Sequence, residues 1–165
     1  MKTPVFLLAL AALTSAVFAE PPAPLDDLRK TLTAAGKDQK MAFILLGRPT
    51  CSNCNATKAM IKEGKIPVTA DSYVMADLNT DDAKTQAEFM RKFSKEVFGN
   101  TLPFIVVTDA KGKALASSSG YKSAEEWKTL LEDAKTKATA KAGTAAPGAP
   151  AAGGNWPFNS APAGK

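Results

Sequence analysis

Two kinds of hydrophobic pattern alternate along the chain: apolar residues at helical spacing, and short continuous apolar runs. Apolar residues that recur every three or four positions predict helices that bury one face. This spacing is found at Leu25, Leu28, Leu32 and Ala35; at Ala56, Ala59 and Met60; at Phe89, Met90, Phe93 and Val97; and at Trp127, Leu130, Leu131 and Ala134. The continuous runs are too short for buried helices and predict strands. They occupy residues 41–46, 73–78 and 104–107.

Capping residues mark where two of the predicted helices begin and end. Asp26 and Asp27 lie at the start of the first helix, where the helix dipole favours acidic side chains, and Gly36 is its predicted end. Ser123, followed three residues later by Glu126, forms a capping box. This pair predicts the start of the last helix.

The order of the elements indicates the fold class. The strand at 104–107 leads through a turn at 109–112 into a fourth strand at 114–118, which predicts an antiparallel hairpin. The complete order is helix, strand, helix, strand, helix, strand, strand, helix. It predicts an α/β domain over residues 20–137, with a central mixed four-stranded sheet and helices on both faces.

The N-terminal residues 1–19 have the three parts of a secretory signal. They are the basic Lys2, an apolar run at 5–13, and small residues that end at Ala19. Because a helix needs about 20 apolar residues to cross a bilayer, we expect cleavage and no stable membrane insertion afterwards, with an uncleaved anchor as the alternative. The protein is therefore expected to be periplasmic or secreted.

The C-terminal residues 138–165 are rich in Ala, Gly and Pro, and the apolar periodicity stops there. Such a segment cannot bury enough surface to offset the entropy of ordering, which predicts a disordered tail. Trp156 and Phe158 are the exceptions within it. They are interpreted either as a docking motif or as an exposed aromatic pair.

Charge and residue content exclude several classes of function. The formal net charge is +5, but acidic residues are interleaved with the Lys and Arg residues, so no nucleic-acid partner is expected. The chain has no histidine, which excludes Cys-His and Ser-His catalysis and histidine-ligated zinc or haem. Two thiolates alone make a poor metal cage, and we predict neither a metal nor an organic cofactor. The protein is expected to be a monomer.

Cys51 and Cys54 lie where a predicted strand is followed by a helix. A helix N-terminus has unpaired N–H groups and a positive dipole potential, both of which favour a thiolate. The spacing lets the second sulfur resolve a mixed disulfide formed at the first, so Cys51 is the predicted nucleophile and Cys54 the resolving thiol. Arg48 and Lys58 could add positive potential near Cys51, although solvated surface charges are the simpler interpretation.

Four segments carry a resemblance to a known family: the strand at 43–46, Cys51-Ser52-Asn53-Cys54, Ala76-Asp77-Leu78-Asn79, and Thr101-Leu102-Pro103-Phe104 with the hairpin that contains Gly112. Over nearly all of the predicted domain, the chain resembles the thioredoxin-like family. The resemblance implies a thioredoxin-like fold in which a cis peptide between Leu102 and Pro103 faces the cysteine pair and the Leu102 backbone helps to hold an extended substrate. The alternative is that Pro103 simply begins a strand.

Three positions depart from the family pattern. Thr50 stands where the family commonly has tryptophan, Leu45 where it often has a buried carboxylate, and Ser52-Asn53 where typical thioredoxins have Gly-Pro. These residues leave thiol chemistry possible. They do not indicate whether the pair reduces, oxidises or isomerises, because the redox potential depends on the relative stability of thiolate and disulfide.

The leading hypothesis is an exported thiol-disulfide oxidoreductase that acts on protein thiols and disulfides through Cys51 and Cys54, with a further, unidentified redox partner protein. The alternative is a redox-inert binding or scaffold module of the same fold with a structural disulfide. A third hypothesis, delivery of Cu(I) by the two thiolates, is disfavoured by the absence of histidine and of a methionine-rich cluster.

Overall fold

The computed structural model describes residues 20–142; the predicted signal at 1–19 and the stretch 143–165, with Trp156 and Phe158, lie outside the described residues. The helices and strands are β1 (Pro24–Leu25), α1 (Leu28–Asp38), β2 (Met41–Gly47), α2 (Ser52–Lys62), β3 (Tyr73–Asn79), α3 (Ala83–Phe93), β4 (Phe104–Thr108), β5 (Ala114–Ser119) and α4 (Ala124–Ala142). The predicted order of helices and strands is confirmed, with one short strand added in front.

The strands form one mixed sheet in the order β1-β3-β2-β4-β5. The strands β1, β3 and β2 run parallel to one another, whereas β4 is antiparallel to β2 and β5 is antiparallel to β4. The predicted α/β class and hairpin are confirmed. The predicted strand count was wrong, because the described part of the chain forms five strands and not four.

The additional strand is β1, which pairs with Met75 and Ala76 of β3. The sequence pattern placed Leu25 on the first helix, but Leu25 belongs to this strand and the helix begins at Leu28. Prolines before Leu25 disfavour helical backbone. A strand of two residues has no periodicity that a pattern could show.

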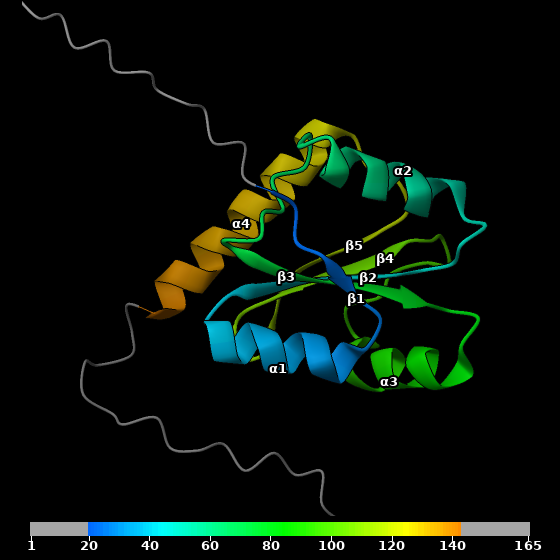
Figure 1. Cartoon of the computed structure of the whole chain (residues 1–165), viewed down its shortest axis with the longest axis horizontal. Helices are drawn as coiled ribbons and strands as arrows, with labels where there is room; N and C mark the ends of the chain where they lie inside the picture. Colours follow the sequence, from blue (N-terminus) through cyan, green and yellow to red (C-terminus); the bar gives the residue numbers. More distant parts are fainter. Residues whose placement is uncertain (1–19, 143–165) are drawn as a thin grey trace, which may run out of the picture.

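Helices cover both faces of the sheet: α2 and α4 lie on one face, and α1 and α3 lie on the other (Figure 1). Side chains of β2 alternate between two apolar clusters, with Phe43 and Leu45 in the cluster on the α2 and α4 face and Ile44 and Leu46 in the other. Phe43 packs edge-on against Trp127 of α4, with ring centroids 6.0 Å apart. Burial on both faces explains why residues 41–46 are continuously apolar.

Two helix ends differ from the predictions. The first helix does not stop at Gly36 but continues to Asp38, and Gln39 ends it in the left-handed conformation. A Cβ atom at Gly36 would lie 3.2 Å from the Ala110 carbonyl oxygen, so this glycine permits close packing against the β4–β5 turn. At the other end of the domain, α4 continues to Ala142, beyond the boundary predicted at residue 137.

The predicted capping box at the start of α4 is present. The Glu126 carboxylate accepts the Ser123 backbone N–H at 2.8 Å, and the Ser123 hydroxyl oxygen accepts the Glu126 N–H at 3.4 Å. Within residues 20–142, no helix is long and apolar enough to cross a membrane.

Candidate active site

The cysteine pair lies at the N-terminus of α2, directly after the loop that leaves β2. Cys51 is the N-cap of this helix, and its sulfur accepts the backbone N–H of Cys54 at 3.1 Å. The sulfur therefore takes the position that an Asp or Ser oxygen commonly takes at a helix start. Because the positive end of the helix dipole points at this atom, the site favours negative charge on the Cys51 sulfur.

Cys51 and Cys54 form a disulfide, with their Cα atoms 5.3 Å apart. Their exposure differs: Cys54 is 0% exposed, whereas Cys51 is only half-buried. An incoming thiolate can therefore approach Cys51 but not Cys54. The roles of nucleophile and resolving thiol require such an asymmetry, and for Cys51 and Cys54 they stay predictions.

Gly47 lies directly against the side chain of Cys54. A Cβ atom at this position would lie 2.6 Å from the Cys54 sulfur, so the sulfur packs directly against the end of β2. The Gly47 carbonyl accepts the backbone N–H of Thr80 at 2.7 Å, which ties the end of β2 to the segment after β3.

Pro103 lies at the same end of the sheet. The Leu102–Pro103 peptide is cis, which confirms the prediction. In the antiparallel pairing of β2 with β4, Leu46 is the partner of Phe104, the last pair of the ladder, and continuing this register by one residue sets Pro103 opposite Gly47. Gly47 therefore has Cys54 above it and Pro103 next to it.

A loop after β5 supports the segment that contains the cis proline. Gly120, which has a positive φ of 75°, donates its backbone N–H to the Pro103 carbonyl at 3.0 Å. The Ser119 hydroxyl donates to the Thr101 carbonyl at 2.7 Å. These bonds fix the backbone on both sides of Leu102, the residue expected to contact a substrate.

Sequence reasoning did not identify Gly47, Thr80 or Gly120. The available signal was weak: Gly47 follows a buried strand, and a strand glycine can mark the close approach of another group. Thr80 and Gly120 give no local signal, because their partners are distant in the sequence.

Both cations near the cysteine pair have carboxylate partners. Arg48 lies 3.6 Å from Asp81, and Lys58 of α2 lies 3.0 Å from Asp77 of β3. These ion pairs agree with the interpretation of Arg48 and Lys58 as surface charges that do not tune the Cys51 sulfur. Asp77 is also the register partner of Leu45, so it places a half-buried carboxylate beside the position where the family often has one.

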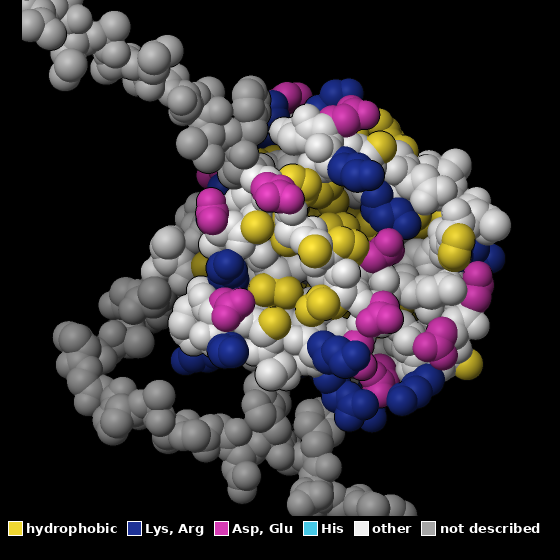
Figure 2. All heavy atoms as spheres, in the orientation of Figure 1, with side chains coloured by type: hydrophobic (Ala, Val, Ile, Leu, Met, Phe, Trp, Pro, Cys, Tyr) yellow, Lys and Arg dark blue, Asp and Glu magenta, His cyan; other side chains and the backbone are white. Residues whose placement is uncertain are grey.

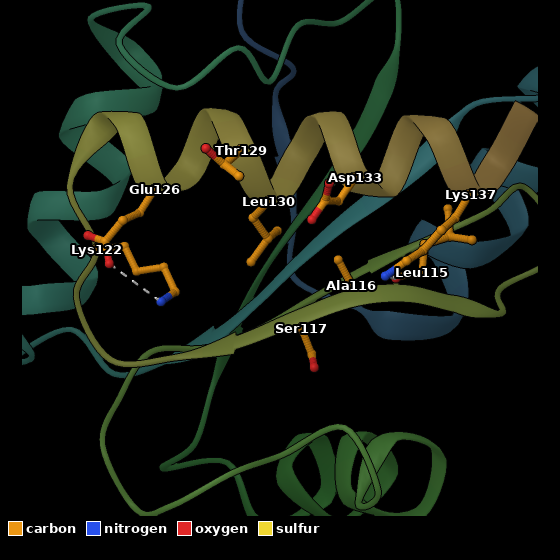
Figure 3. A pocket seen from close by; sticks show the side chains of 9 residues that line it. All are labelled: Leu115, Ala116, Ser117, Lys122, Glu126, Thr129, Leu130, Asp133 and Lys137. Carbon is orange, nitrogen blue, oxygen red and sulfur yellow. Dashed lines mark hydrogen bonds and ion pairs between the residues drawn. The ribbon is translucent and has the colours of Figure 1, made fainter.

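A separate groove lies between β5 and α4 (Figure 3). Leu115, Ala116 and Leu130 supply its apolar part, and the Lys122–Glu126 ion pair lies at one end. Neither cysteine contributes to it. On the face seen in Figure 2, Lys and Arg side chains are interspersed with Asp and Glu, as the sequence pattern indicates.

A mixed sheet with helices on both faces, a cysteine pair at the start of α2 and a cis proline at the same end of the sheet define a thioredoxin-fold domain. Residues 28–135 match the family model for a thioredoxin-like domain. The chain therefore belongs to the thioredoxin-like family.

Solved structures show the same fold at low sequence identity. An uncharacterised thioredoxin-like protein from Clostridium perfringens is 14% identical, with a TM-score of 0.51 over 76% of this chain and 90% of that one. A mutant thioredoxin from Halobacterium salinarum is 17% identical, with a TM-score of 0.50 over 69% of this chain and 92% of that one.

A third similar structure is a chain from the complex of ferredoxin:thioredoxin reductase with thioredoxin f2. It is 14% identical, with a TM-score of 0.51 over 71% of this chain and 96% of that one. No curated protein sequence matches the chain. At these identities the similarity establishes the fold alone, so the function is argued from the site.

Proposed function

We propose that this protein is an exported thiol-disulfide oxidoreductase that exchanges disulfides with protein thiols through Cys51 and Cys54. The observation that carries the proposal is the asymmetry of the pair. Cys51 is half-buried at the tip of α2 with a backbone N–H directed at its sulfur, whereas Cys54 is 0% exposed behind it.

In the oxidising direction, a thiolate of the partner protein attacks the Cys51 sulfur and breaks its bond to Cys54. The electron pair of that bond leaves on the Cys54 sulfur, which takes up a proton. A second partner thiolate then attacks the partner's own sulfur in the mixed disulfide and releases Cys51 as a thiolate. The partner has lost two electrons and the cysteine pair has gained them.

In the reducing direction the same steps run backwards. The Cys51 thiolate attacks a partner disulfide, and Cys54 then closes the ring and releases the reduced partner. The N–H that Cys54 donates to the Cys51 sulfur stabilises the thiolate that leaves in one direction and attacks in the other. A further redox partner protein would restore the starting state.

The substrate segment is proposed to lie along Leu102 and Pro103. Pro103 is next to Gly47, and the loop at Gly120 holds its carbonyl in place. An extended partner segment there would present its cysteine to Cys51 from the exposed side of the pair.

Trapping tests the proposal. In a Cys54→Ala variant the mixed disulfide at Cys51 cannot be resolved, so covalent adducts with partner proteins are expected to accumulate and to disappear on reduction. The matched control is the Cys51→Ala/Cys54→Ala double variant, which should form none. If the single variant forms no adducts while an alkylating reagent still modifies Cys51, the proposal is wrong.

A redox-inert scaffold is the second candidate, favoured by Leu45 at the family's carboxylate position and by Thr50 where the family commonly has tryptophan. Titration of the Cys51–Cys54 pair in glutathione buffers distinguishes a scaffold from an exchange enzyme. A potential near the glutathione poise supports exchange, whereas one below about −300 mV is typical of a structural disulfide.

A further inference from the structure

Gly47 is the residue at which the sheet contacts the buried member of the cysteine pair. A Cβ atom there would lie 2.6 Å from the Cys54 sulfur, 3.2 Å from the Cys54 Cβ and 3.2 Å from a Leu45 methyl group. Ordinary van der Waals contacts of a Cβ atom begin at 3.4 Å. Any side chain at position 47 therefore requires either the Cys54 sulfur or the backbone of residue 47 to move.

The backbone at Gly47 has little freedom to retreat. Its carbonyl accepts the Thr80 N–H at 2.7 Å, it pairs with Asn79 of β3, and the register with β4 places Pro103 on its other side. The described glycines with positive φ are Gly64, Gly99, Gly112 and Gly120. Gly47 is not among them, so its conformation suits any residue, and what disfavours a side chain is the lack of space, most severely beneath the Cys54 sulfur.

The two redox states differ in how freely the Cys54 sulfur can move. In the disulfide, the bond to Cys51 and the short ring between the two residues fix the sulfur against Gly47. In the dithiol, rotation about the Cα–Cβ bond of Cys54 can carry the sulfur away from that position. A side chain at position 47 would thus destabilise the disulfide more than the dithiol.

We infer that Gly47 is a positioning residue that makes the Cys51–Cys54 disulfide harder to reduce. The reaction it influences is the reduction of the disulfide by two glutathione thiols, which gives two protein thiols and one glutathione disulfide. The inference deepens the proposed function at the same site. Its test is independent of that function, because the equilibrium with glutathione needs no partner protein.

The decisive measurement is the equilibrium of a Gly47→Ala variant with glutathione, followed by alkylation and mass. We expect at least a tenfold shift towards the dithiol, which corresponds to a potential about 30 mV higher. The matched control is Gly36→Ala on α1, another glycine without positive φ whose added Cβ meets only the Ala110 carbonyl oxygen, at 3.2 Å. An unchanged or lower potential in Gly47→Ala overturns the inference.

A stability cycle covers the case in which Gly47→Ala folds poorly. The decrease in the free energy of unfolding caused by Gly47→Ala is measured in the oxidised protein. It is measured again in the Cys51→Ala/Cys54→Ala background, where the sulfur is absent. We expect a smaller cost in that background, since the contacts with Leu45 and with Cβ of residue 54 are common to both. Equal costs would show that the sulfur is not what glycine accommodates.

The two proposals can fail separately. If the Cys54→Ala variant traps no partner but the redox potential of the Gly47→Ala variant rises, the catalytic role is wrong. Gly47 then remains the residue that protects a structural disulfide. If the Cys54→Ala variant traps partners but the redox potential of the Gly47→Ala variant is unchanged, the exchange function stands and the role of Gly47 is wrong.

Discussion

Tyr73 shows at the residue scale how burial changes the chemistry of one side chain. It is 1% exposed on the sheet face that α2 and α4 cover, and its hydroxyl has no hydrogen-bond partner within residues 20–142. Burial, with a smaller contribution from the charge of Glu132, raises the pKa of Tyr73 to about 12. The folded protein therefore holds this phenol in its neutral form.

The Tyr73→Phe variant should keep its stability or gain about 1 kcal/mol at neutral pH, because it removes a buried hydroxyl without a partner. In the wild type, ionisation of Tyr73 does not affect stability below its ordinary pKa of 10.0. Above that pH the unfolded chain releases the Tyr73 proton more readily than the folded one, so the free energy of unfolding falls as the pH rises towards about 12. Denaturant unfolding between pH 8 and 11 should therefore show a weaker alkaline loss in Tyr73→Phe.

The control for this prediction is Tyr121→Phe, since Tyr121 is 53% exposed. That variant should retain the alkaline loss of the wild type. If the free energy of unfolding falls equally with pH in the wild type and in Tyr73→Phe, the buried phenol does not contribute to the alkaline loss of stability.

At the scale of single elements, the start of α1 depends on one side chain. Asp27 is the N-cap, and its carboxylate accepts the backbone N–H of Lys30 at 2.8 Å. That hydrogen bond is the main reason why the pKa of Asp27 is lowered. Since α1 supplies Leu28 and Ala35 to the core, the cap fixes where an apolar helix face begins.

The Asp27→Ala variant should lose about 1 kcal/mol of unfolding free energy at pH 7, and Asp27→Asn should lose less because it keeps an acceptor. The folded pKa of Asp27 is depressed, so its charge stabilises the fold above the ordinary value of 3.8 and ceases to do so as the pH falls through the folded pKa. The difference between wild type and Asp27→Ala should therefore shrink in acid.

Urea unfolding at pH 7 and at pH 3 measures this change. Asp26→Ala is the matched control, because the neighbouring Asp26 is exposed and does not cap the helix. A loss as large for Asp26→Ala as for Asp27→Ala would contradict the assignment of the cap.

At the scale of the whole molecule, the sheet assembles the site from separate parts of the sequence. Pairing of β2 with β3 and β4 brings Thr80 and Pro103 to Gly47, beneath the cysteine pair. Within residues 20–142, the buried hydrophobic core uses residues from Leu28 to Ala134.

Export belongs to the whole chain, and residues 1–19 are proposed to direct it. Deleting them should retain the protein inside the producing cell, while the Tm of the purified domain stays the same as that of the exported form. Fractionation measures the first effect, and the mass of the exported protein should correspond to a chain that starts at Glu20. An exported protein of full-length mass would contradict cleavage.

Prediction from sequence succeeded where the signal is local. The strand at 41–46, the Ser123–Glu126 capping box and the hairpin around 109–112 each depend on residues close together in the chain. Two of the predictions that failed concern residues with distant partners. Leu25 pairs with a distant strand, and Gly36 lies inside a helix and packs against the β4–β5 turn.

The sequence by itself determined the order of helices and strands, the α/β class and the placement of Cys51 and Cys54 at a helix start, because periodicity, caps and spacing act over a few residues. The family resemblance predicts that Pro103 faces the pair, but only the tertiary structure decided that Gly47 and Thr80 also lie beneath it. These residues meet through strand pairing, and its register depends on the packing of the complete sheet between its helices.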